Sequence, residues 1–206
     1  MAFRRDYKKQ RCLGSGHFGE VFLANWRGKS VAIKEVVNTD RNTAQQEIKI
    51  LKQVDHPYII KYYNHAMENN ILCIVLEYAD KGTIEKAVQT HNIHKEEWNI
   101  WRCIAHLSSA LAYLHRRDPQ ILHHDIKPDN ILGVSEWYKT ERGHRISWKL
   151  ADFGVAKMLT REAQAEYYGA DVPGVPTYMG PEVLRNLRHT ALHLMYGRLA
   201  ASLPSL

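Results

Sequence analysis

Hydrophobic and polar residues alternate in several stretches of the first third of the chain, which is the pattern of half-buried β-strands. VFLANW begins at Val21 and VAIKEVV begins at Val31, and both are rich in β-branched and aromatic residues. The turn-like sequence RGKS separates them, so the two segments are predicted to be neighbouring strands. HPYIIKYY, from 56 to 63, and NILCIVLEYA, from 70 to 79, predict two further strands. The beginning of the chain is therefore predicted to be mainly β.

Two segments repeat their apolar residues at the spacing of an amphipathic helix. The first is TAQQEIKILKQV, from 43 to 54, which has Ile48, Leu51 and, less regularly, Val54 along one side. The second is EWNIWRCIAHLSSALAYLH, from 97 to 115. The apolar positions of the second segment include Trp101, Ile104, Leu107, Leu111 and Leu114.

The composition, 45% hydrophobic and 24% charged residues, is that of a soluble globular protein. A length of 206 residues allows one large domain or two small lobes. The net charge of +6 would suit an anionic partner, but the Lys and Arg residues are spread along the chain without a long basic run. The strongest apolar run, ILCIVL at 71–76, is far too short to cross a bilayer. Neither a nucleic acid nor a membrane is therefore expected as a partner.

The N-terminal sequence and the cysteines indicate the cellular location that is expected for the protein. The N-terminal sequence MAFRRDYKKQ has no apolar stretch, so a secretory signal is not expected. Cys12, Cys73 and Cys103 lie far apart and form no CxxC pair, so neither a disulfide framework nor a cysteine-based zinc site is expected. These features favour an intracellular, reducing location, cytoplasmic or nuclear.

A glycine-rich segment, LGSGHFGEV, contains G-x-G-x-x-G at Gly14, Gly16 and Gly19. A dinucleotide-binding turn would need a helix directly after the third glycine, whereas a strand-like segment follows here. The pattern therefore favours two strands joined by a bare backbone loop, whose N–H groups can approach phosphate oxygens. On the next strand Ala32 and Lys34 share one face. A small apolar residue beside an ammonium suits a flat apolar ring joined to phosphates.

Glu47 lies near the edge of the apolar stripe of the segment 43–54. Most charged residues on helices are solvent-exposed, and that is one interpretation of Glu47. The other is that Glu47 pairs with Lys34 and holds its ammonium toward phosphate.

A dense polar run, LHHDIKPDN at 122–130, interrupts apolar sequence, and ADFG follows at 151–154. Together LGSGHFGEV, VAIK, the segment bearing Glu47, HHDIKPDN and ADFG resemble, in order and context, the signature set of the eukaryotic protein kinases. The resemblance covers about residues 7–184. It implies an α+β, protein-kinase-like bilobal fold, with a mainly β N-lobe with one helix at about 7–79 and an incomplete helical C-lobe at about 80–184. Residues 185–206 form an atypical tail.

The resemblance also implies catalytic roles, because phosphoryl transfer depends on positioning and charge stabilisation. Asp125 would accept the proton of the substrate hydroxyl, and Lys127 would offset charge on the moving phosphoryl group. Lys34, oriented by Glu47, would hold the α and β phosphates of ATP. The implied ligands of Mg²⁺ are Asn130 and Asp152. Turn formation is the common alternative for an aspartate in a loop, but it does not account for Lys127 at its offset.

The resemblance further implies the residues around the nucleotide. Plain core packing is an alternative for the apolar ones, and it is compatible with nucleotide binding. Leu76 would be the gatekeeper residue, and Glu77 and Ala79 would offer backbone hydrogen bonds. The other implied nucleotide-binding residues are Leu13, Gly14, Gly16, Gly19, Val21, Ala32 and Leu132.

The implied function is ATP-dependent transfer of the γ-phosphoryl group to Ser or Thr of protein substrates. Lys127-Pro128 favours a serine/threonine kinase over a tyrosine kinase. The alternative is a catalytically impaired or inactive module that binds nucleotide or acts as a scaffold. A further expectation is an elongated β-turn insertion between Leu132 and Leu150, because this segment is longer than a tight hairpin needs.

The sequence also departs from the family pattern. His124 stands where the family has an Arg that binds a phosphate on the activation segment, and histidine cannot reproduce its bidentate hydrogen bonds. In GVPTYMGPE, at 174–182, Val175 replaces a Thr that bridges Asp125 and Lys127, and Gly180 replaces an Ala. The residues after 182 lack the expected Asp-x-Trp helix, so the chain resembles a truncated kinase. The apolar face of the segment 97–115 is therefore expected to be partly exposed.

Overall fold

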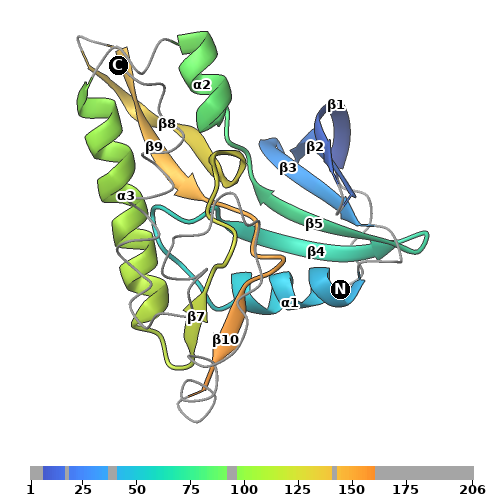
Figure 1. Ribbon diagram of the computed structural model, residues 1–206. Coiled ribbons are helices and arrows are strands. Elements are labelled where there is room, and N and C mark those ends of the chain that lie inside the picture. Colours follow the sequence, from blue (N-terminus) through green and yellow to red (C-terminus); the bar gives the residue numbers. More distant parts are fainter. Residues whose placement is uncertain (1–6, 17–18, 37–40, 92–96, 141–142, 161–206) are drawn as a thin grey trace.

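The N-terminal part of the chain folds into a five-stranded antiparallel sheet with the strand order β1-β2-β3-β5-β4 (Figure 1). The computed structural model describes residues 7–16, 19–36, 41–91, 97–140 and 143–160. Strands β2 and β3 lie where the alternating pattern predicted them, and β1 pairs with β2 as the glycine spacing indicated. The strands are β1 (Tyr7–Gly16), β2 (Gly19–Trp26), β3 (Lys29–Val36), β4 (Tyr62–Glu68) and β5 (Ile71–Glu77).

Helix α1 (Arg41–Leu51) packs its apolar stripe on one face of this sheet. Ile48 and Ala44 lie in one buried cluster with Val36, Leu72 and Ile74. The helix ends at Leu51, so the expectation that Val54 belongs to the helical stripe is wrong. Val54 follows a turn and packs, partly buried, on the larger core below.

The strand expected at 56–63 is displaced along the chain, because β4 begins only at Tyr62. Residues 56–61 instead run between the two parts of the molecule. The Ile60 N–H donates to the Leu150 carbonyl at 2.9 Å, and the Leu150 N–H donates to the Tyr58 carbonyl at 2.9 Å. Ile59 and Ile60 are consecutive and both buried, which a strand with one solvated face does not allow. Ile59 and Ile60 are both apolar because both are buried between the N-terminal sheet and the lower part of the molecule.

In the described residues the remaining elements are two α-helices, one 3₁₀ helix and the strands of two small sheets. One sheet has the strand order β6-β8-β9, and the other pairs β10 with β7. Strands β8 and β9 form a long antiparallel hairpin, which confirms the elongated insertion expected between Leu132 and Leu150. The elements are β6 (Gly82–Thr83), α2 (Ile84–His91), α3 (Glu97–His115), β7 (Gln120–Leu122), the 3₁₀ helix η3 (Pro128–Asn130), β8 (Ile131–Thr140), β9 (Gly143–Leu150) and β10 (Lys157–Leu159).

Helix α3 has the predicted bounds, but its apolar face is covered. Leu107, Leu111 and Leu114 are buried, whereas Trp101 is 59% exposed. Strand β9 packs along α3, as Figure 1 shows, and its Trp148 is buried in the same core. The expectation of an exposed face is therefore wrong for these leucines, because the long hairpin supplies the cover. None of the helices in the described parts of the chain combines the length and hydropathy of a membrane-spanning helix.

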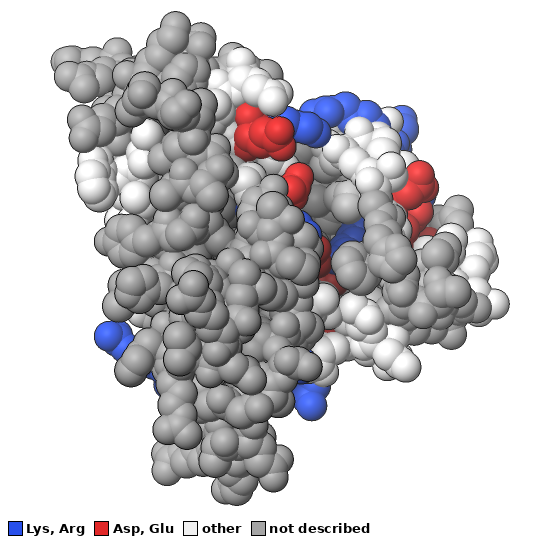
Figure 2. All heavy atoms as spheres, viewed as in Figure 1, with Lys and Arg blue, Asp and Glu red and all other residues white. Residues whose placement is uncertain are grey.

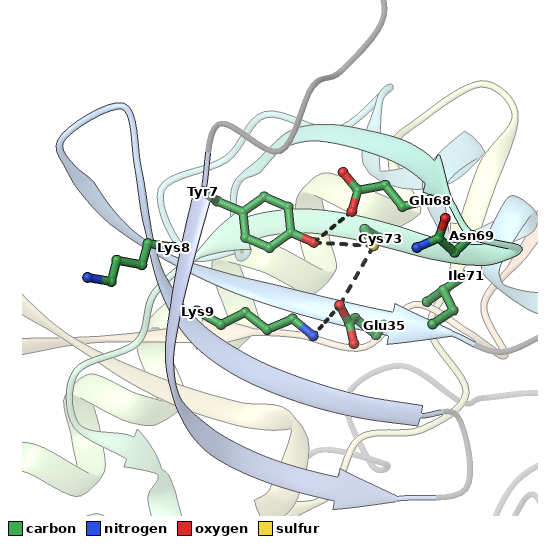
Figure 3. A pocket seen from close by; sticks show the side chains of 8 residues that line it. All are labelled: Tyr7, Lys8, Lys9, Glu35, Glu68, Asn69, Ile71 and Cys73. Carbon is green, nitrogen blue, oxygen red and sulfur yellow. Dashed lines mark hydrogen bonds and ion pairs between the residues drawn. The ribbon is translucent and has the colours of Figure 1, made fainter.

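A cavity of about 400 Å³ opens on the face of the sheet opposite α1, between β1 and the turn from β4 to β5 (Figure 3). The Tyr7 hydroxyl lies 3.5 Å from a Glu68 carboxylate oxygen and 3.6 Å from the Cys73 sulfur. Lys9 and Glu35 form an ion pair at 2.6 Å below them. Burial raises the pKa of Cys73 and of Tyr7, so both groups stay protonated at neutral pH. These contacts join the two edge strands at this end of the sheet.

Gly19→Ala is expected to destabilise the glycine-rich hairpin. Gly19 has a φ of 120°, and a Cβ there would lie 1.9 Å from the Glu35 carbonyl oxygen. Backbone strain of this kind costs about 1–3 kcal/mol, so thermal unfolding should show a lower Tm. Gly14→Ala is the matched control, because nothing lies within 4 Å of its Cβ position. Equal Tm values for the two variants would contradict this reading of the loop.

Candidate active site

Lys34 forms two ion pairs at the boundary between the sheet and the lower part of the molecule. Its Nζ donates to Glu47 Oε2 at 2.7 Å and to Asp152 Oδ1 at 3.1 Å. Strand β3 supplies Lys34 and helix α1 supplies Glu47, so packing of α1 on the sheet brings the pair together. Lys34 is 9% exposed and Glu47 is 2% exposed. The interpretation of Glu47 as a solvent-exposed residue is wrong, and pairing with Lys34 is confirmed.

The charges of these three side chains depend on one another. Burial alone lowers the pKa of Lys34, but the two carboxylates outweigh it and leave this pKa raised. Burial raises the pKa of Glu47, and the Lys34 ammonium opposes that shift. Burial would also raise the pKa of Asp152, but Lys34 and the Gly154 N–H lower it overall. Lys34 therefore remains a cation with an ionised Asp152 beside it.

The polar run at 122–130 folds into a loop around Asp125, whose side chain is buried at 8% exposure. The Lys127 Nζ donates to Asp125 Oδ2 at 2.7 Å, and the Asn130 Nδ2 donates to the same oxygen at 2.8 Å. Asn130 Nδ2 also donates to the Asp125 carbonyl at 2.7 Å. Within the described residues both side-chain bonds to Asp125 fall on Oδ2, so Oδ1 is the oxygen that can accept a proton. In the same described part of the chain only the Asn130 Nδ2 is used, so its amide oxygen can bind a ligand.

Two bonds attach this loop to the segment that carries Asp152. The Ala151 N–H donates to the Asn130 carbonyl at 2.9 Å, and His123 Nε2 lies 3.0 Å from the Ala151 carbonyl. The His123 ring also packs edge-on against Phe153, with 4.8 Å between ring centroids. Asp152 has a φ of 60°, a left-handed conformation that is uncommon outside glycine. Its neighbours Ala151 and Phe153 are buried, while its carboxylate reaches Lys34.

The residues expected around a nucleotide lie on β1, β2, β3, β5 and β8 and in the segment directly after β5. Ala32 is buried and is the register partner of Leu76, and Leu13, Val21 and Leu132 are half-buried. Gly16 and Gly19 are partners across the hairpin, and Gly14 is exposed. The Glu77 N–H donates to the Lys61 carbonyl at 2.8 Å. Ala79 is half-buried, and its carbonyl accepts from Gly82 N at 3.2 Å. Their roles toward a nucleotide stay predictions.

The sequence patterns did not identify three polar contacts near this boundary. His123 links the loop to Ala151, and its place inside the polar run 122–130 was the available signal. The Glu77 carboxylate forms an ion pair with Lys149 at 2.9 Å. Asp80 is hydrogen-bonded to Ser135, and neither spacing nor periodicity indicates a contact between residues so far apart.

Of the three residues that depart from the family pattern, the structure describes His124 alone. His124 is half-buried and has a φ of 63°. Val175 and Gly180 lie outside the described residues. Figure 2 shows acidic and basic side chains meeting in a hollow between the sheet and the lower part of the molecule. Lys34, which is held between two carboxylates at this boundary, supplies a cation that can bind a phosphate oxygen.

Comparison with known proteins decides the family. The family description "Protein kinase domain" matches residues 7–197, which is most of the chain. The chain belongs to the protein kinase domain family. The resemblance and the α+β fold, with a mainly β N-lobe and one helix, are thereby confirmed. Protein kinases in general use ATP and Mg²⁺ to phosphorylate protein substrates.

Several curated relatives of this kinase domain are similar to it over most of its length. "Probable serine/threonine-protein kinase drkB" of Dictyostelium discoideum is 32% identical over 186 residues, 86% of this chain and 24% of the relative. "Serine/threonine-protein kinase Nek8" of Danio rerio is 32% identical over 185 residues, 86% of this chain and 24% of the relative. "Cytokinesis protein sepH" of Aspergillus terreus is 34% identical over 184 residues, which are 87% of this chain and 12% of the relative. The chain spans a quarter or less of the length of these relatives.

Proposed function

We propose that this kinase domain transfers the γ-phosphoryl group of ATP to Ser or Thr hydroxyls of protein substrates. One observation carries the proposal: Lys34 is bound by Glu47 and Asp152 together, next to a loop in which Asp125 holds Lys127 and Asn130. This arrangement offers a cation for phosphate oxygens and a carboxylate for a proton. Relatives described as serine/threonine kinases, together with Lys127-Pro128, support the choice of acceptor.

The chemistry needs little from the protein beyond position and charge. The substrate hydroxyl oxygen forms a bond to the γ-phosphorus, and the bond from that phosphorus to the β–γ bridging oxygen breaks, which releases ADP. The hydroxyl proton passes to Asp125, whose Oδ1 is available. Lys127 donates to the other oxygen of Asp125 and lies two residues away, so it can offset negative charge on the moving phosphoryl group. Lys34 holds the phosphates that remain on ADP.

The residues present fit Mg²⁺. The described residues contain no group of three or more His, Cys, Asp or Glu side chains that could hold a metal ion by themselves. Mg²⁺ in ATP sites needs only one or two protein ligands, because phosphate oxygens and water complete its shell. The ionised Asp152 and the amide oxygen of Asn130 would be those ligands. A bound Mg²⁺ would neutralise charge on the phosphates.

A second candidate is a module that binds nucleotide without turnover. The observation in its favour is Val175, which has no hydroxyl to bridge Asp125 and Lys127. In the structure Lys127 already contacts Asp125 directly at 2.7 Å. The two candidates agree on nucleotide binding and differ on phosphoryl transfer, so an assay of transfer separates them.

Mg-ATP is expected to raise the Tm of the protein, and Asp152→Asn should remove most of this rise. A ligand at about 100 times its Kd stabilises a protein by roughly 2.7 kcal/mol. That free energy corresponds to several degrees, at about 2–4 °C per kcal/mol for this chain length. The matched control is Asp129→Asn, since Asp129 is exposed and one residue from Asn130. Equal rises in wild type and Asp152→Asn would refute the assigned binding mode.

A further inference from the structure

Asp80 lies directly after the connection between the two lobes, and it is bound by a residue of the lower sheet. The Ser135 N–H donates to Asp80 Oδ1 at 2.7 Å, and the Ser135 hydroxyl donates to Asp80 Oδ2 at 2.6 Å. Ser135 belongs to β8, so one residue of the long hairpin satisfies both carboxylate oxygens. Hydrogen bonds to an ionised carboxylate are about twice as strong as neutral ones.

The backbone reinforces this contact. The Lys81 N–H donates to the Gly133 carbonyl at 3.0 Å, and β6 pairs with β8 through Gly82 and Gly133 and through Thr83 and Leu132. A Cβ on Gly133 would lie 2.8 Å from the Lys81 Cβ, so only glycine allows the two segments to lie this close. The segment after the lobe connection is therefore fastened to β8 along several residues.

This position matters for a nucleotide. Leu132 is the residue of β8 expected against the adenine ring, and Ala79 is, with Glu77, expected to offer backbone hydrogen bonds to the nucleotide. Ala79 precedes Asp80, and Leu132 lies three residues before Ser135 in the same strand. The two bonds between Asp80 and Ser135 thus act beside the backbone pairing to hold two sides of the expected adenine slot together.

We propose that Asp80 and Ser135 are positioning residues that hold the adenine slot at its binding width. The inference rests on the proposed function, because it concerns the affinity of the same site for ATP. Neither residue touches the reacting atoms, so the contact acts through Ala79 and Leu132. Removal of the contact lets the two sides separate, and nucleotide affinity falls while the chemistry of the bound complex is unchanged.

The charge state of Asp80 is consistent with this role. Burial alone would raise the pKa of Asp80, but the two bonds from Ser135 and the charge of Lys81 lower it overall. Lys81 Nζ lies 3.5 Å from Asp80 Oδ2. The carboxylate is therefore ionised at neutral pH, and both hydrogen bonds are charge-assisted.

The test measures the Kd of Mg-ATP by calorimetry. Ser135→Ala is expected to raise Kd about three- to tenfold, which corresponds to about 0.6–1.4 kcal/mol. Ser135→Thr keeps the hydroxyl and should restore binding close to wild type. Asp80→Asn keeps the size but not the charge, and it should weaken binding in the same direction. The control is Ser147→Ala, which removes a hydroxyl bond to Glu136, at 3.0 Å, within the same hairpin but away from the lobe connection.

The outcomes distinguish a failure of the proposed function from a failure of the positioning role of Asp80 and Ser135. If wild-type protein binds no Mg-ATP, the proposed function fails. If wild type binds and Ser135→Ala and Asp80→Asn bind equally well, the positioning role is overturned and the proposed function stands. A similar rise in Kd for Ser147→Ala would also overturn it, because the effect would then belong to the hairpin as a whole. A rise in Kd confined to the Asp80–Ser135 contact, reversed by Ser135→Thr, is the supporting result.

Discussion

Asp125→Asn is expected to lower the rate of phosphoryl transfer by about 10²–10⁴-fold, the usual contribution of a positioned general base. Asparagine keeps the shape of the side chain but cannot take up the substrate proton. It also leaves Lys127, which donates to Asp125 at 2.7 Å, without its anionic partner. Nucleotide binding should change little, because Lys34 and Asp152 are untouched. The measurement is the transfer rate at saturating Mg-ATP, with Kd measured beside it.

The control for Asp125→Asn is the exposed Asp129→Asn in the same loop. It removes the same charge from the loop but no group assigned to catalysis, so the transfer rate should stay near that of wild type. Equal rates for all three proteins would remove Asp125 from the mechanism.

Lys34→Met should reduce transfer by about 10²–10³-fold, the typical cost of losing one group that stabilises developing charge. Methionine has a similar length but no charge for the phosphates. The substitution also strands Glu47, which is 2% exposed, and breaking a buried ion pair costs about 3–5 kcal/mol. A loss of activity in this variant alone could therefore reflect unfolding.

The double variant Lys34→Met with Glu47→Gln separates these effects. It removes the stranded charge, so the Tm should rise above that of Lys34→Met alone while transfer stays low. If the double variant recovered both the transfer rate and the Tm, Lys34 would act only through the stability of the protein.

The sequence predicted the parts of this protein that depend on local pattern. Alternation located β2, β3 and β5, helical spacing gave the bounds of α3, and the glycine spacing indicated the hairpin of β1 and β2. The pairing of Lys34 with Glu47 was one of two interpretations, and only packing of α1 on the sheet decided it.

The features that the sequence did not predict depend on contacts between distant segments. Ile59 and Ile60 resemble a strand, but they are buried because Leu150 bonds that backbone. The leucines of α3 are covered by β9, which an account of the helix alone could not include. The Asp80–Ser135 contact joins residues 55 positions apart, with no periodic signal in either segment.

The most direct test of the central claim is transfer of label from γ-labelled ATP, with Mg²⁺, to generic protein substrates. Wild type and Asp125→Asn are compared, and the labelled amino acids are identified after hydrolysis. The account predicts label on Ser or Thr with wild type and almost none with Asp125→Asn. Absence of transfer by a wild-type protein that still binds Mg-ATP would contradict it and favour a nucleotide-binding module. Label on Tyr alone, or equal label with Asp125→Asn, would also contradict it.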